Sequence, residues 1–234
     1  MTSRHADFSK LVFELDEQYQ DFTEPPSKDL QSLVDRVRRC LSWLKRAAYL
    51  SVEDRPPRFV DLWIAFNSLY GKRHYKEGSF KGELADFMTF LAKFRKVDSA
   101  SDALQVWMGK KHVQGRGRDL IQNKFLWNEF WNGEVDEYEN QVGKELRIFE
   151  IALVHHDIET FFRCLFSRLR VLRNQIIHGS ASSDTRRIKD ALVPGILLLE
   201  ELIPIFLSLM IEKGQSVPWP EVPYPGRLTP QHPM

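Results

Sequence analysis

The chain has 234 residues, of which 43% are hydrophobic and 28% charged, as in ordinary globular domains, so the composition fits neither a disordered chain nor a membrane bundle. With 33 Lys and Arg against 32 Asp and Glu, the formal charge is only +1. No field of the whole molecule therefore attracts nucleic acid, and any basic site has to be local.

The N-terminal part alternates helical patterns with proline-containing breaks. Residues 1–26 are a charged N-terminal extension in which we expect one short helix. From residue 27, apolar side chains recur every three or four positions behind a serine, which predicts a capped amphipathic helix of about six turns. The segment EDRPPR (53–58) is a breaker, because proline lacks an N–H and restricts the residue before it. A second helix is predicted over 59–70, ended by Gly71 in the left-handed conformation.

The middle of the chain shows weaker periodicity. Helical spacing returns over 84–94, and one short helix is expected around Trp107. The stretch GKKHVQGRGR (109–118) predicts a mobile basic loop, because glycines disfavour a helix and the basic side chains repel one another. Helical patterns follow over 119–131 and over the acidic stretch 134–150.

The C-terminal part carries the strongest helical signals. A long apolar face begins near Asp157 and is expected to end at Gly179. Residues 188–211 are apolar on most sides, which predicts a central helix, kinked at one of its two prolines. Residues 213–234 form a proline-rich tail, expected to lie extended on the surface or to be disordered. No useful strand-like alternation and no internal repeat occurs, so the predicted fold class is all-α.

The cysteines and the apolar segments bear on location. Cys40 and Cys164 fall on apolar helical stripes, which predicts buried free thiols in a reducing compartment. The first ten residues lack the apolar core of a signal peptide, and the apolar run 191–211 contains two glutamates and two prolines. We expect a cytoplasmic protein without a membrane span.

Three polar side chains near the end of the helix that begins at Asp157 form the candidate site: Arg173, Asn174 and His178. On a helix, Asn174 and His178 share a face, whereas Arg173 lies about 140° round the axis from His178. The three side chains therefore converge only if a second copy contributes, and a two-fold dimer would bring two arginines and two histidines to one cleft.

The segment from Arg173 to His178, RNQIIH, resembles the HEPN superfamily signature, in which an arginine and a polar residue precede a histidine after four to six intervening positions. Residues 61–71, DLWIAFNSLYG, are similar to the aromatic helix that many bacterial members place earlier. The resemblance implies a HEPN-like helical bundle of four to five core helices over 27–212. Within that range, residues 72–150 would be an insertion.

By this resemblance the chain would be a metal-independent endoribonuclease without cofactors, plausible as a toxin or antiphage effector that works as a homodimer on RNA. His178 would be the acid/base, Arg173 the charge stabiliser and Asn174 the orienting donor, and the products would end in 2′,3′-cyclic phosphate and 5′-hydroxyl. An antitoxin or regulatory protein is a possible partner. Members neutralised by a nucleotidyltransferase carry a tyrosine where this chain has Ser180, so that mode of neutralisation is not expected.

Other basic residues are candidates for RNA contact, although a solvated helix face explains most of those on the helix better, and solvated loop charge explains those in the loop about as well. They are Arg168 and Arg170 on the same helix, and Lys110, Lys111 and Arg116 in the predicted basic loop. His155 and His156 are adjacent, but no second cluster with ligand spacing accompanies them, so no metal site is expected.

Two other functions stay open. One is a catalytically inactive HEPN module that dimerises and binds RNA or a protein, and the other is a helical ligand-binding bundle unrelated to RNA. In both, His178 would simply interact with the last carbonyls of its helix, where a histidine is favourable.

Overall fold

The computed structural model describes residues 2–22, 30–72, 80–94, 98–178, 186–220 and 222, and within these ranges every regular element is a helix. The prediction of an all-α fold is confirmed. The elements, in chain order, are α1 (Thr2–Phe22), α2 (Gln31–Tyr49), α3 (Arg55–Tyr70), α4 (Phe80–Phe94), α5 (Asp98–Gly109), α6 (Lys111–Gln122), the 3-10 turn η2 (Lys124–Leu126), α7 (Asn128–Trp131), α8 (Val135–Val154), α9 (Ile158–Ile177), α10 (Arg186–Lys213) and the 3-10 turn η3 (Gly214–Ser216).

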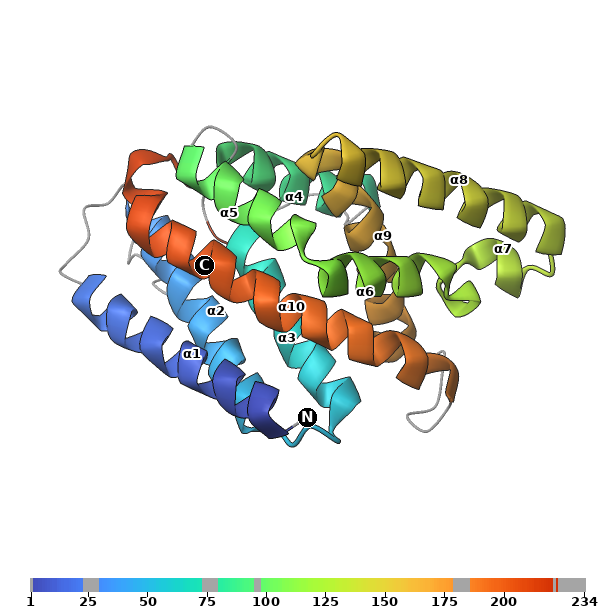
Figure 1. Cartoon of the computed structure of the whole chain (residues 1–234). Coiled ribbons are helices and arrows are strands. Elements are labelled where there is room, and N and C mark those ends of the chain that lie inside the picture. The colour runs from blue at the N-terminus through green and yellow to red at the C-terminus, as the bar shows by residue number, and fades with distance from the viewer. Residues whose placement is uncertain are drawn as a thin grey trace, which may run out of the picture.

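In Figure 1, α10 crosses the middle of the molecule, with α1 on one side of it and α5 and α6 on the other. Helix α10 packs against α1, α2, α3, α5, α6 and α9, while α9 also contacts α4 and α8. Aromatic rings fill the interior between α3, α4, α9 and α10. The closest pair, Phe87 and Phe166, stacks with ring centroids 4.8 Å apart, and Phe66 and Phe206 pack around it. Helices α4, α5 and α6, which lie in the predicted insertion, thus share one core with α9 and α10.

Helix α1 is longer than the short helix expected. It runs for 21 residues, because Phe8, Val12, Leu15 and Tyr19 recur at helical spacing and are all buried, packing the helix against α2 and α10. Helix α2 begins at Gln31, and the serine cap expected at residue 27 lies outside the described residues.

Helix α3 starts earlier than the sequence predicted. Pro56 and Pro57 occupy its first turn, where the N–H that proline lacks has no helical partner to lose, so the supposed breaker is the beginning of the helix. The prediction for Gly71 was wrong: its φ is −53°, outside the left-handed region, and its N–H donates to the Asn67 carbonyl over 2.8 Å.

The basic segment 109–118 was expected to be a mobile loop, and this was wrong. Most of it belongs to α6, whose inner side chains are buried against α8, α9 and α10. Gly117 makes that packing possible, because a Cβ at this position would lie 2.5 Å from Cζ of Phe149. The helical pattern expected over 119–131 is divided, since α6 ends at Gln122 and two short turns, η2 and α7, follow.

Helix α10 continues through Pro194 and Pro204 for 28 residues. By length and composition the stretch 189–216 could cross a membrane, but 72% of its apolar window is buried inside the protein, as expected of the central helix of a bundle. The start of the tail also joins the core. Trp219 packs against Phe90 and Phe94, and Val222 is buried, so this part of the predicted surface tail is partly wrong.

One buried cation fastens the tail to the end of α3. The guanidinium of Arg36 donates to the carbonyls of Leu69 (3.1 Å), Gly71 (2.9 Å) and Pro220 (3.0 Å). Its side chain is fully buried, and burial lowers the pKa of Arg36 to about 10.

Candidate active site at the end of α9

Helix α9 presents the candidate residues from a firmly anchored position. Asp157 caps its first turn, accepting hydrogen bonds from the backbone N–H of Thr160 (3.1 Å) and from its hydroxyl (2.7 Å). The inner face is buried through Leu172, as the apolar spacing predicted. The predicted start is confirmed, and the helix ends at Ile177, two residues before the predicted end.

His178 lies directly after the last helical residue. Its backbone N–H donates to the Asn174 carbonyl over 3.0 Å, and its side chain is exposed. Asn174, one turn earlier, is half-buried, and Ile177 beside the histidine keeps 53% of its surface exposed. Within the described residues the imidazole makes no hydrogen bond or ion pair, so it stays accessible to a ligand or to another chain.

Arg173 is held by a carboxylate that the sequence did not indicate. Its Nη2 lies 2.6 Å and 2.8 Å from the two carboxylate oxygens of Glu83 on α4, and the Nε of Arg170 donates to the same carboxylate over 3.0 Å. The guanidinium carbon of Arg173 also lies 5.4 Å from the ring centre of Trp63 on α3. The Glu83 carboxylate is thus shared by two guanidinium groups.

Two buried polar atoms of this cluster have no hydrogen-bond partner among the described residues, the Tyr70 hydroxyl and Nε of Arg173. Burial raises the pKa of the Tyr70 hydroxyl well above its ordinary value, and the nearby Glu83 carboxylate adds to this effect. The tyrosine therefore stays neutral and adds no charge to the cluster.

The predicted RNA-contacting role of Arg168 does not fit its position. Its guanidinium stacks on Trp127, with Cζ 3.8 Å from the ring centre, and its Nη1 donates to the Leu126 carbonyl over 2.7 Å. Its Nε also lies 3.2 Å from Glu145, close enough for an ion pair although the angle does not make a hydrogen bond. Arg168 therefore ties α9 to η2 and α8.

Of the other predicted RNA-contacting residues, two arginines form ion pairs within the protein and two lysines are exposed. Arg116 is buried, and its Nη1 donates to the Glu201 carboxylate over 2.7 Å, so it links α6 to α10 and is not available to RNA. Arg170 is committed to Glu83. Lys110 and Lys111 are exposed at the start of α6 and remain accessible.

Within the described part of the chain, no three His, Cys, Asp or Glu side chains lie close enough together to bind a metal ion. His155 and His156 lie at the exposed end of α8.

No protein-family model matches the chain, and neither a curated protein nor a solved structure shows significant similarity to it. The likeness to the HEPN superfamily thus rests on the residues of α3 and α9 alone.

Proposed function

We propose that this protein is a HEPN-like, metal-independent endoribonuclease of the cytoplasm that acts on RNA as a homodimer, in a toxin or antiphage defence role. One observation carries the proposal: an accessible imidazole at the end of an anchored helix follows, after four intervening residues, a guanidinium that a carboxylate and an indole hold in place.

The chemistry follows from these groups. His178 takes the proton of the RNA 2′-hydroxyl, and the His178 of the second copy protonates the leaving 5′-oxygen, since an imidazole can both accept and donate a proton. Arg173 stabilises the charge that develops on the phosphate. Asn174, on the same face of α9 as His178, donates a hydrogen bond that orients the phosphate.

The dimer draws support from the surface around the histidine. Ile177 is half-exposed next to the imidazole, and a second copy placed on a two-fold axis at the end of α9 would cover this apolar side chain. The same arrangement would add a second pair of Arg173 and His178 side chains to the cleft.

The test compares three forms of the purified chain on mixed cellular RNA with EDTA present. The original chain should cut RNA and leave 2′,3′-cyclic phosphate ends, and His178→Ala should cut about a hundredfold more slowly or not at all, since acid/base groups contribute about this much. His155→Ala, at another exposed histidine at a helix end, is the matched control and should cut normally. Equal cleavage by the original chain and His178→Ala, or none by a dimer of the original chain, would contradict the proposal.

A catalytically inactive HEPN module is a second candidate, because the Arg173 guanidinium that the reaction needs is already paired with the Glu83 carboxylate. Such a module would form a dimer, bind RNA or a protein such as an antitoxin, and leave RNA uncut. Solution mass and an RNA-binding assay on the same samples separate it from the enzyme.

A further inference from the structure

A small cavity far along the chain from Arg173 has a marked excess of positive charge. It has a volume of about 190 Å³ and lies between the first turn of α1, the start of α3 and the middle of α10. Its charged side chains are three arginines, Arg4, Arg55 and Arg58, against one carboxylate, Glu200. The first turn of α1 lies beside the connection between α2 and α3 in Figure 1.

The carboxylate is already used by one of the arginines. Arg58 is buried, its Nε donates to Glu200 over 2.6 Å, and its Nη1 donates to the Leu50 carbonyl over 3.0 Å. Because this pair is internally neutral, Glu200 offers little to the other two cations. Arg4 has no ion pair within the described residues, and Arg55 lies 3.7 Å from Glu53, a side chain that is 74% exposed and so interacts weakly.

His5 contributes a hydrogen-bond donor to the positively charged cavity. The Nη2 of Arg58 lies 2.9 Å from Nδ1 of His5, and a guanidinium only donates, so Nδ1 is the acceptor and the ring proton resides on Nε2. Burial, together with Arg58, lowers the pKa of His5 below its ordinary value, which keeps the ring neutral in this tautomer. His5 lines the cavity.

The remaining walls are apolar, and the cavity adjoins a larger hollow. The walls comprise Val52, Val193, Ile196 and Leu197. The hollow, about 440 Å³ in volume, shares Arg4, Leu197 and Glu200 with the cavity and has a largely apolar floor of Phe8, Leu11, Pro204 and Ile205.

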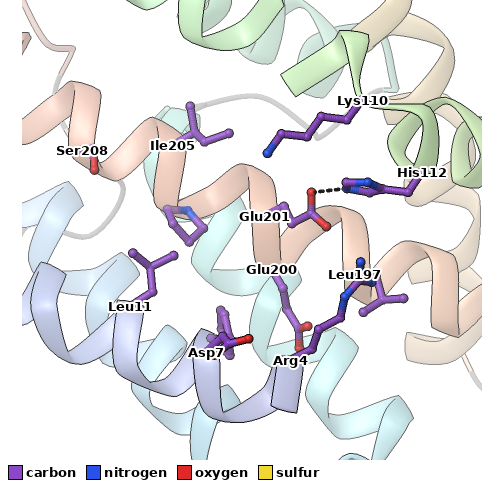
Figure 2. Close-up of a pocket in the computed structure, with 12 residues that line it drawn as sticks. Arg4, Asp7, Leu11, Lys110, His112, Leu197, Glu200, Glu201, Ile205 and Ser208 are labelled. Carbon is purple, nitrogen blue, oxygen red and sulfur yellow. Dashed lines mark hydrogen bonds and ion pairs between the residues drawn. The ribbon is translucent and has the colours of Figure 1, made fainter. Parts of the chain in front are cut away.

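In Figure 2, Lys110 and His112 enter this hollow from the start of α6, while Asp7 and Leu11 enter from α1. The Glu201 carboxylate at its edge is occupied by His112 (2.9 Å) and Arg116 (2.7 Å). The hollow therefore offers apolar surface, the Lys110 ammonium, which has no ion-pair partner in the described part of the chain, and one carboxylate, Asp7, on the side of α1.

We propose that this cavity binds a small organic anion, whose charged group is held by Arg4 and Arg55 and whose short apolar body lies along Leu197 into the adjoining hollow. Guanidinium groups match phosphate and carboxylate oxygens in geometry, and a pocket with apolar walls and a few polar groups is typical of small-molecule sites. The inference does not depend on the proposed nuclease.

The experiment is calorimetric titration of the full chain with hexyl phosphate, hexanoate, inorganic phosphate and 1-hexanol. We expect one of the two hexyl anions to bind, with an affinity that falls as salt is added, and 1-hexanol to bind much more weakly. The preferred anion tells whether phosphate or carboxylate is the natural head group. Inorganic phosphate should bind more weakly than hexyl phosphate if that ester is preferred.

Variants locate the site. The double substitution Arg4→Gln and Arg55→Gln should weaken binding about tenfold or more, since each loses a charge-assisted contact. Arg163→Gln on α9 is the control, because Arg163 is half-exposed, pairs with Glu159 and does not line the cavity. His178→Ala should bind like the original chain.

Circular dichroism must show that each variant keeps its helical spectrum. The proposal is overturned if neither anion binds, if 1-hexanol binds as well as they do, or if the folded Arg4/Arg55 double variant binds as tightly as the original chain.

Discussion

Replacing Glu83 by glutamine tests the cluster that holds Arg173. The substitution removes the one negative charge shared by Arg170 and Arg173 and at least one of three short contacts, of 2.6, 2.8 and 3.0 Å. These side chains are only about one-fifth exposed, so solvent screens the loss incompletely. A hydrogen bond to a charged group is worth about 1.5 to 3 kcal/mol, and glutamine keeps one acceptor, so we expect a loss of about 2 kcal/mol.

The assay is urea unfolding followed by tryptophan fluorescence, with the free energy of unfolding extrapolated to water. For a chain of this size, about 2 kcal/mol corresponds to a fall of about 4 to 8 °C in melting temperature. Glu159→Gln is the control: Glu159 pairs with Arg163 one turn away, both half-exposed, and its loss should cost less than about 0.5 kcal/mol. If Glu83→Gln costs no more than this control, the carboxylate does not hold the two arginines in solution.

Three further predictions concern other parts of the fold. Gly117→Ala should destabilise by about 1 to 3 kcal/mol in urea unfolding because of the close ring contact, whereas Gly115→Ala, with open space at its Cβ, should stabilise by up to about 1 kcal/mol. Burial raises the pKa of the Cys164 thiol to about 12, so a thiol reagent should modify it at neutral pH only after denaturant is added, and rapid modification of the folded chain would contradict this. Hydrogen bonds from Arg118 lower the pKa of Glu150 in the folded protein. The Arg118–Glu150 pair therefore stabilises the fold above the pKa that Glu150 has in the unfolded chain, and this stabilisation is lost as the pH falls through the pKa of Glu150 in the folded protein. Glu150→Gln should therefore cost a few tenths of a kcal/mol near neutral pH, because the pair is partly exposed, and nothing in strong acid.

Helix α9 was predictable because its information is local. Its apolar side chains recur at helical spacing, and Asp157 is a strong cap, so the sequence indicated both the start of the helix and its buried face. Helix α1 carried a similar signal in Phe8, Val12, Leu15 and Tyr19, which its charged surroundings obscured.

Helix α6 was not predictable for the opposite reason. Gly117 disfavours a helix locally, but it is needed where Phe149 crosses, and Arg116 is neutralised by Glu201, 85 residues away in the chain. Tertiary contacts thus override local propensity here. Glu83 was missed likewise, since its partner Arg173 is 90 residues away and no motif marks it.

The guanidinium of Arg36 has a practical consequence for protein engineering. It donates hydrogen bonds to carbonyls at the end of α3 and to the Pro220 carbonyl, so deleting the chain from residue 217 onward would leave this buried cation with one acceptor fewer. The deletion would also expose the rings of Phe90 and Phe94, which Trp219 covers. Affinity tags and fusion partners are therefore best attached after Val222, where they leave the packing of Trp219, Pro220 and Val222 against the rest of the protein unchanged.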